Sequence, residues 1–218
     1  MWNIEDKNGF VYETQNQRGQ INIDQDFGKI IYDLASNAEN KTFVDIGTWN
    51  GLGSTRCFIE GMKSNIESVL YTIENNSEKY EHAKSMWASS IKESGLNVNF
   101  LNGSLIKNDD IDRWLDENKI ELDETQQYWL TIDKANSTKN LIIDCDYIDI
   151  LLIDGSDYSG YLELILLKDI SKYILLDDVK SLKNEMSRKY LLDSNDFELI
   201  SEDLHSRNGY SVFKKINK

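Results

Sequence analysis

Aspartates follow two apolar segments of the chain, where a buried strand would reach the surface. The run IDILLI predicts a buried strand, and Asp154 and Asp157 come directly after it. A second apolar run, KYILL, ends in Asp177 and Asp178. Carboxylates can serve as general bases, and several together can bind a hard divalent cation. These aspartates are therefore candidates for catalysis or for metal binding.

A glycine-rich loop lies at another predicted junction between a strand and a helix. In VDIGTWNGLGS, residues 44–54, Gly47, Gly51 and Gly53 follow an apolar strand and precede a segment with helical spacing. Glycines at such a turn let a ligand approach the backbone closely, and the first turn of the helix offers unpaired N–H groups. The loop therefore predicts a ligand site.

Short-chain dehydrogenases, which bind a nicotinamide dinucleotide, also have Gly-x3-Gly-x-Gly at this junction. Their catalysis requires a Tyr-x3-Lys pair, and this chain has Tyr80 and Lys84. In those enzymes the pair comes after several strands, whereas here it lies on the helix that follows the second strand. A nicotinamide-dependent oxidoreductase is therefore a less favoured alternative.

The acid that lies two residues before the first glycine favours a different family. The loop resembles motif I of class I S-adenosylmethionine (SAM) dependent methyltransferases, in which the acid and the glycine turn hold the aminoacyl end of SAM. The resemblance continues with an acid at the end of the next strand, which can accept both ribose hydroxyls, and with LNGSL beside the adenine. It implies that SAM is bound by Asp45, Gly47, Thr48, Trp49, Asn50, Gly51, Gly53, Ser54, Glu74, Gly103, Ser104 and Asp154. Taken alone, Glu74 is equally consistent with an acid exposed to solvent at the end of a strand. Trp49 is equally consistent with a side chain that packs over the first turn of the helix and contacts no ligand.

The aspartates after the two apolar runs resemble the ligands of metal-dependent O-methyltransferases, both the catechol type and the macrolide-sugar type with its cephalosporin-hydroxylase-like relatives. The family pattern implies Asp154, Asp177 and Asp178 as ligands of Mg²⁺ or Mn²⁺, and its sheet order would bring them to one edge. Three carboxylates about 5 Å apart repel one another by roughly 3 kcal/mol per pair, which a cation would relieve. The simpler interpretation is that the acidic pair only ends a strand and caps the next segment.

The general base of that family, a Lys or a His, lies three residues after the first metal ligand, and this chain has Asp157 there. A carboxylate with a pKa near 4 is a weak base toward a sugar hydroxyl. Asp157 is therefore a base with a raised pKa or a hydroxyl acceptor, or the base lies elsewhere. His205 is a further candidate, whereas His82 is expected at the surface. Tyr158 and Tyr161 are expected either to line the acceptor pocket or to pack.

The elements that position these residues alternate between strand and helix, which predicts an α/β fold. We expect a Rossmann-like doubly wound sheet in a single domain, mostly parallel with an antiparallel C-terminal hairpin. Residues 1–40 are expected to form an N-terminal segment and a helix, in which RGQIN, residues 18–22, closes over SAM. Residues 105–146 are expected to form a lid or substrate wall with one helix and irregular structure. Strands are predicted near residues 42–47, 68–74, 97–103, 147–155 and 172–179, helices near 53–63, 76–94 and 161–170, and the hairpin near 197–203 and 210–216.

The charge of the chain argues against partners that carry negative charge. The net charge is −14, and KSLKNEMSRK, the densest basic stretch, is diluted by uncharged and acidic residues. We therefore expect no nucleic acid as a partner. No apolar run approaches the about 20 residues that a membrane span needs, so we expect no membrane span and a cytoplasmic, soluble protein, in a host cytoplasm if the source is viral. Cys57 and Cys145 lack metal-ligand spacing and are expected to be structural. A homodimer is compatible with the sequence.

The favoured hypothesis is a SAM- and Mg²⁺-dependent O-methyltransferase. A metal chelated by adjacent hydroxyls would favour a vicinal diol, and the polar segment 105–146 favours a sugar or glycan over a catechol. The alternatives are a metal-independent methyltransferase acting on another small molecule and a non-catalytic SAM-fold module that binds a partner.

Overall fold

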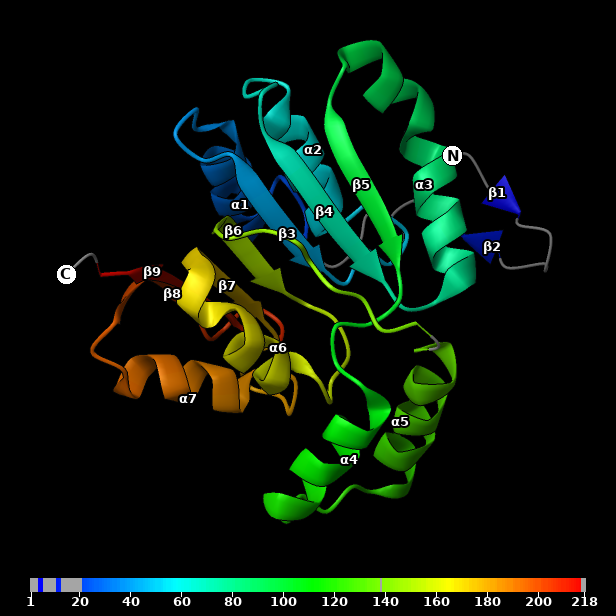
Figure 1. Ribbon diagram of the computed structural model, residues 1–218, viewed down its shortest axis with the longest axis vertical. Coiled ribbons are helices and arrows are strands. Elements are labelled where there is room, and N and C mark those ends of the chain that lie inside the picture. Colours follow the sequence, from blue (N-terminus) through cyan, green and yellow to red (C-terminus); the bar gives the residue numbers. More distant parts are fainter. Residues whose placement is uncertain (1–3, 6–10, 13–20, 138, 217–218) are drawn as a thin grey trace.

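The computed structural model describes residues 4–5, 11–12, 21–137 and 139–216, and its centre is a seven-stranded sheet in the order β5-β4-β3-β6-β7-β9-β8 (Figure 1). Strands β3 to β7 are mutually parallel, and β9 runs antiparallel between β7 and β8. The bounds are β3 Thr42–Ile46, β4 Val69–Glu74, β5 Asn97–Asn102, β6 Ile148–Ile153, β7 Ser171–Asp177, β8 Phe197–Asp203 and β9 Tyr210–Lys215. The predicted mostly parallel Rossmann-like sheet with an antiparallel C-terminal hairpin is confirmed.

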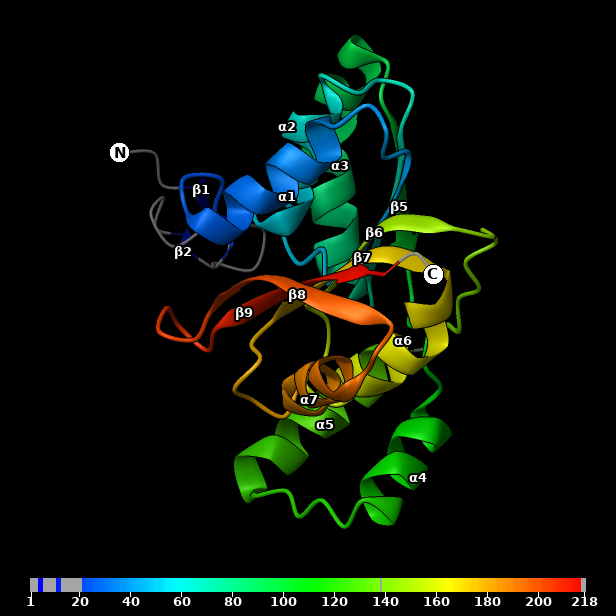
Figure 2. The ribbon, with the colours of Figure 1, turned by 90° about the vertical axis from the view of Figure 1, so that its left-hand side faces the viewer.

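Helices cover both faces of the sheet, as Figure 2 shows. One face packs against α1 (Asp26–Ser36), α2 (Ser54–Met62) and α3 (Ser77–Ser94). The other packs against α6 (Gly160–Leu167), the 3₁₀ turn η1 (Lys168–Ile170) and α7 (Glu185–Asp193). Every residue of β6 is buried, because this central strand has helices on both sides, and all of its residues except Asp149 are accordingly apolar.

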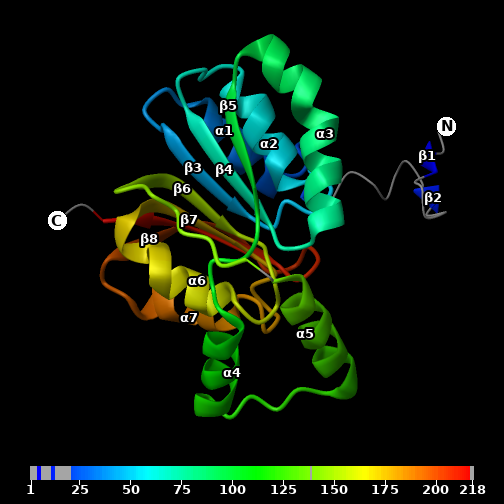
Figure 3. The ribbon, with the colours of Figure 1, turned by 45° about the vertical axis from the view of Figure 1, so that its right-hand side comes forward.

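The segment 105–146 contains two helices, α4 (Asn108–Glu117) and α5 (Glu124–Asn136), which extend away from the sheet (Figure 3). The sequence predicted one helix, because α5 has no buried residue and therefore no apolar periodicity. Its start is set by a capping box, in which Asp123 accepts from the backbone of Gln126 and the Gln126 side chain accepts in return. Trp114 of α4 packs with Tyr158, which joins the segment to the sheet edge.

The N-terminal part contains a short antiparallel pair, β1 (Ile4–Glu5) and β2 (Val11–Tyr12). The predicted closing segment RGQIN lies mostly outside the described residues, and its Ile21 is buried. Cys57 is buried in the core and Cys145 is half-buried, in agreement with structural roles. No helix in the described part of the chain combines the length and apolar composition needed to span a membrane.

Candidate active site

A cavity of about 390 Å³ lies at the carboxyl ends of the parallel strands. The chain order reverses between β3 and β6, and ligands of doubly wound sheets bind at such a switch point. Most of the residues that the sequence assigned to SAM, to catalysis or to a metal line this cavity: Gly47, Thr48, Trp49, Gly53, Ser54, Glu74, Gly103, Ser104, Asp154, Asp157 and Asp178. Four assigned residues are outside the lining: Asp45, Asn50, Gly51 and Asp177.

At Gly47 the glycine loop passes between the ends of β4 and β6 with no space for a side chain. Gly47 has φ +107°, and a Cβ added there would lie 2.2 Å from the carbonyl oxygen of Asp154. The backbone N–H groups of Gly47 and Thr48 both donate to the carbonyl of Ile73 at 3.0 Å. Gly51, with φ +76°, accepts at 2.8 Å from the indole of Trp87. Glycine at these positions is required because of the left-handed backbone and the close approach.

Asp45 lies behind this loop and supports it. Its carboxylate accepts hydrogen bonds from the hydroxyls of Ser54 at 2.9 Å, Thr55 at 2.6 Å and Thr72 at 3.1 Å. Burial raises the pKa of Asp45, while these hydroxyls lower it. The acid thus ties the first turn of α2 to β4, and Asn50 binds within the loop by accepting from the backbone of Leu52.

Glu74, at the end of β4, presents a buried carboxylate to the cavity. Its two oxygens accept from the backbone N–H of Trp49 at 2.7 Å and of Asn76 at 2.9 Å. Burial raises the pKa of Glu74, and these N–H groups act in the opposite direction. Each carboxylate oxygen has a second lone pair, so both can still accept a ligand hydroxyl.

The loop after β5 is joined to the end of the inserted segment. The backbone N–H of Ser104 donates to Lys139 at 2.9 Å, and its carbonyl accepts from Leu141 at 2.8 Å. The Ser104 hydroxyl donates to the Ile106 carbonyl at 2.9 Å. Gly103 has φ +149° and packs against Lys139. The predicted adenine loop is therefore one wall of the cavity, and it is stiffened by the inserted segment.

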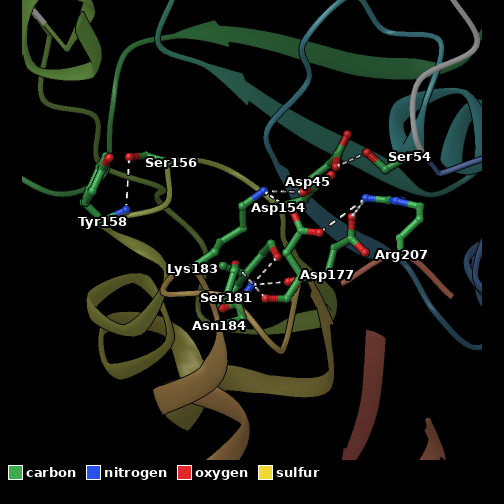
Figure 4. Close-up of polar contacts among 12 residues, drawn as sticks. Asp45, Ser54, Asp154, Ser156, Tyr158, Asp177, Ser181, Lys183, Asn184 and Arg207 are labelled. Carbon is green, nitrogen blue, oxygen red and sulfur yellow. Dashed lines mark hydrogen bonds and ion pairs between the residues drawn. The ribbon is translucent and has the colours of Figure 1, made fainter. Parts of the chain in front are cut away.

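The carboxylates after β6 and β7 meet, as the family pattern implied: one oxygen from each of Asp154, Asp177 and Asp178 lies within 4.8 Å of the others. Two cations, which the sequence reasoning missed, lie among them (Figure 4). The buried ammonium of Lys183 is 2.9 Å from both Asp154 and Asp178. Arg207, from the β8–β9 turn, is 2.9 Å from Asp177 and 3.4 Å from Asp178.

Backbone strain and shifted pKa values accompany this cluster. Asp178, Arg207 and Trp49 all have positive φ angles (54°, 52° and 48°), which are uncommon outside glycine and often mark functional sites. Burial, and then the charges of its acidic neighbours, raise the pKa of Asp177 to about 7. Burial acts to raise the pKa of Asp178 as well, but Lys183 and Arg207 outweigh it and lower that pKa. Asp154 keeps a raised pKa because its burial outweighs Lys183.

A divalent ion does not fit this cluster while Lys183 is in place. The three carboxylates are oxygen donors of the kind that Mg²⁺ and Mn²⁺ take. However, an ion on Asp154 or Asp178 would stand about 4 Å from the ammonium, and the repulsion at an effective dielectric near 20 is about 8 kcal/mol. The two cations already relieve the repulsion among the carboxylates that would otherwise call for an ion.

The remaining sequence candidates divide between the cavity and the surface. Asp157 is exposed and lines the cavity. Asp133 of α5 also lines the cavity, and the sequence reasoning had not singled out this acid. The hydroxyl of Ser156 donates to Asp133 at 2.6 Å, and burial raises the pKa of Asp133. Tyr158 lines the cavity, but its hydroxyl donates to the Gln126 carbonyl at 2.6 Å and holds α5 in place.

Other candidates lie away from the cavity. His82 is exposed on α3, as expected, and His205 is exposed outside the lining. Tyr161 packs against Trp114, with ring centroids 6.1 Å apart. The pair Tyr80 and Lys84 lies on the outer helix α3 with a 3.0 Å hydrogen bond, and neither lines the cavity, so the dehydrogenase arrangement is not formed.

One buried acid in the cavity wall was not among the residues that the sequence singled out. Glu163 of α6 is buried, accepts from the Ser159 hydroxyl at 2.8 Å, and its second oxygen has no hydrogen-bond partner among the described residues. Burial raises the pKa of Glu163 to about 7. An acid inside an apolar helix gives no sequence signal, because the helix YLELILL is otherwise typical of core packing.

No family model and no curated protein matches the sequence. Solved structures match the fold. A methyltransferase from Geobacter sulfurreducens aligns with a TM-score of 0.58 at 16% identity, covering 90% of this chain and 81% of that chain. An O-methyltransferase from Bacillus cereus in complex with S-adenosylhomocysteine (SAH) aligns with a TM-score of 0.55 at 15% identity, covering 87% and 80%. An O-methyltransferase from Streptomyces achromogenes, involved in tomaymycin synthesis and bound to SAM, aligns with a TM-score of 0.56 at 16% identity, covering 87% and 79%. The chain therefore has the fold of class I SAM-dependent methyltransferases, the family that its glycine loop resembles.

Proposed function

We propose that this chain is a SAM-dependent O-methyltransferase that methylates a hydroxyl of a sugar or glycan. The observation that carries the proposal is the cavity, which joins the glycine loop and the carboxylate of Glu74 to the aspartates after β6. The neighbouring structures with bound SAM or SAH support the cofactor.

We place the adenosine of SAM between Glu74 and the loop of Gly103, with its ribose hydroxyls donating to Glu74. The methionyl part follows the loop from Gly47 to Ser54, of which Gly47, Thr48, Trp49, Gly53 and Ser54 line the cavity at the start of α2. This orientation brings the sulfonium and its methyl group toward Asp154 at the end of β6.

The reaction is an in-line displacement. The acceptor oxygen forms a bond with the methyl carbon, the carbon–sulfur bond breaks, and its electron pair remains on sulfur, which leaves neutral SAH. The charge on sulfur disappears during the transfer, so the site has to align the reactants more than it has to supply a strong base. We assign the hydroxyl proton to Asp157, because this carboxylate lines the cavity and is open to solvent.

The wall formed by α5 supports a sugar as the acceptor. Trp129 lines the cavity with 54% of its surface exposed, and an indole can cover the apolar face of a sugar ring. Asp133 and Asp157 provide carboxylates for adjacent hydroxyls. An acceptor without negative charge also suits a chain of net charge −14.

The metal-assisted form of this reaction is favoured by the donor types and opposed by Lys183. The three clustered carboxylates are suitable ligands for Mg²⁺ or Mn²⁺, but the ammonium of Lys183 lies between Asp154 and Asp178 and contacts one oxygen of each. The transfer is therefore assigned to the residues of the chain alone.

The proposal is tested by incubating the protein with SAM carrying a ¹³C-labelled methyl group and a panel of neutral oligosaccharides with vicinal hydroxyls. Mass spectrometry should show one labelled methyl group on the sugar and an equal amount of SAH. A parallel reaction contains EDTA. Binding of SAM without transfer to any acceptor, together with an unchanged biological effect of Asp154→Ala, would instead indicate a non-catalytic module.

A further inference from the structure

The position of Lys183 has a consequence for the chemistry of the site. We infer that Lys183 is the resident cation of the carboxylate cluster, takes the place of a divalent ion, and donates a hydrogen bond to the acceptor hydroxyl. The part that concerns the acceptor rests on the proposed function, whereas the exclusion of an ion rests on the geometry of the cluster alone.

The contacts of Lys183 leave one donor for a ligand. An ammonium has three N–H groups. Among the described residues the Lys183 ammonium contacts Asp154 and Asp178, each at 2.9 Å, which uses two of them. Lys183 also lines the cavity, although only about a tenth of its side chain is exposed. A buried cation at the wall of a ligand cavity, with donor capacity to spare, is placed to bind an oxygen of that ligand.

The backbone of Lys183 is held in place by its surroundings. The side-chain amide of Asn184 donates to the carbonyls of Ile153 at 2.9 Å and Asp177 at 2.8 Å, and so bridges the ends of β6 and β7. A Cβ added at Gly160 would lie 2.3 Å from the carbonyl oxygen of Lys183, so α6 starts in direct contact with this segment. The ammonium is therefore positioned by the framework of the sheet, not by a loose surface loop.

Arg207 completes the charge balance. It pairs with Asp177, the carboxylate that Lys183 does not reach directly, and also approaches Asp178. The two cations offset two of the three carboxylate charges. The cluster thus has little remaining negative charge with which to attract a divalent ion.

Lys183 keeps its own protons in the transfer. It donates a hydrogen bond to the acceptor oxygen while that oxygen bonds to the methyl carbon, the carbon–sulfur bond breaks toward sulfur, and the hydroxyl proton passes to Asp157. The role of the ammonium is to orient the oxygen and to favour its deprotonated form.

The inference is tested by titrating Mn²⁺ into the full-length protein without acceptor, by calorimetry and by the electron paramagnetic resonance of free Mn²⁺. The variants are Lys183→Met, whose unbranched side chain is one atom shorter and uncharged, and Lys180→Met, a matched control at an exposed lysine of the same segment. Wild type and Lys180→Met should show no saturable site at millimolar Mn²⁺. Lys183→Met should gain one site and bind at least about a hundredfold more tightly, because the repelling charge is gone.

The outcomes separate this inference from the proposed function. Saturable Mn²⁺ binding to wild type, or no gain in Lys183→Met, would overturn the place given to Lys183, whether or not methyl transfer is observed. If circular dichroism shows that Lys183→Met does not fold, Lys183→Gln replaces it. The wild-type titration then still tests whether the cluster excludes Mn²⁺. Where transfer is measured, wild-type activity should survive EDTA, and Lys183→Met should raise the acceptor KM and lower kcat while SAH affinity stays within about twofold. Activity abolished by EDTA would contradict the inference.

Discussion

The substitution Glu74→Gln tests the placement of SAM, because it keeps the shape of the side chain and removes its charge. In wild type both carboxylate oxygens accept a backbone N–H, from Trp49 at 2.7 Å and from Asn76 at 2.9 Å, and both can accept a ribose hydroxyl. The amide of Gln has one accepting oxygen, so its NH₂ group must face one of these N–H groups. The loop is thereby disturbed on the side where the ribose is placed.

The expected loss of affinity follows from these hydrogen bonds. A hydrogen bond to a charged group contributes about 1.5–3 kcal/mol, against about 1 kcal/mol for a neutral pair. The difference is about 0.5–2 kcal/mol per hydrogen bond, so replacing the carboxylate under two ribose hydroxyls should weaken SAH binding by about 1–4 kcal/mol, or about 5- to 1,000-fold in Kd.

Calorimetric titration with SAH measures this loss, and Glu81→Gln on the exposed side of α3 is the matched control. Thermal unfolding of each variant shows that the protein remains folded at the temperature of the titration. An SAH affinity of Glu74→Gln within about twofold of wild type would refute the assignment of the ribose to this carboxylate.

Further predictions concern the proton acceptor, the acceptor wall and a buried acid. Asp157→Asn should lower kcat by at least about 100-fold with little change in SAH affinity, and equal losses in kcat for Asp133→Asn would contradict the assignment of the base to Asp157. Trp129→Ala should raise the KM for a sugar acceptor about tenfold and leave SAH binding unchanged; an unchanged KM would remove the indole from the acceptor site. The pKa of Glu163 is raised by burial from 4.5 to about 7, so the folded state retains a proton that the unfolded state releases, and stability falls as pH rises from 5 to 8. Glu163→Gln removes this pH dependence. Urea unfolding should therefore show that the free energy of unfolding of the variant, relative to wild type, rises by about 3 kcal/mol between pH 5 and pH 8. A difference in unfolding free energy that does not change with pH would be inconsistent with a protonated Glu163.

The parts of the site that the sequence predicted are those that follow directly from a strand end. Gly47 and Glu74 follow apolar strands, and parallel strands bring their carboxyl ends to one edge, so the pattern of apolar runs is enough to infer which residues meet there. The same reasoning, with the sheet order of the family, brought Asp154 and Asp178 together.

The cations of the site could not be predicted in this way. Lys183 belongs to the stretch KSLKNEMSRK, which the sequence analysis described only as basic residues diluted by uncharged and acidic ones. Arg207 belongs to the hairpin turn, in which the sequence analysis named His205 as the candidate. Each reaches one carboxylate that is distant in the chain. Arg207 reaches Asp177, 30 residues away, because β9 is inserted between β7 and β8. Lys183 reaches Asp154, 29 residues away, because Asn184 ties its segment to β6 and β7. Neither contact leaves a periodic or local signal in the sequence.

The supporting position of Asp45 has a similar reason. The acid of the glycine loop points toward hydroxyls of α2 and β4 that follow it by nine, ten and 27 residues, so its burial depends on how the helix docks. The sequence identifies the loop but does not distinguish a residue that touches the cofactor from one that holds the loop.

The most direct test of SAM binding in this cavity is a crystal structure of the protein with SAH. We predict SAH at the carboxyl edge of the sheet, with its ribose hydroxyls on Glu74, its sulfur beside Asp154, and Lys183 still between Asp154 and Asp178. Density for SAH at another part of the molecule, or a ribose that does not touch Glu74, would contradict this placement.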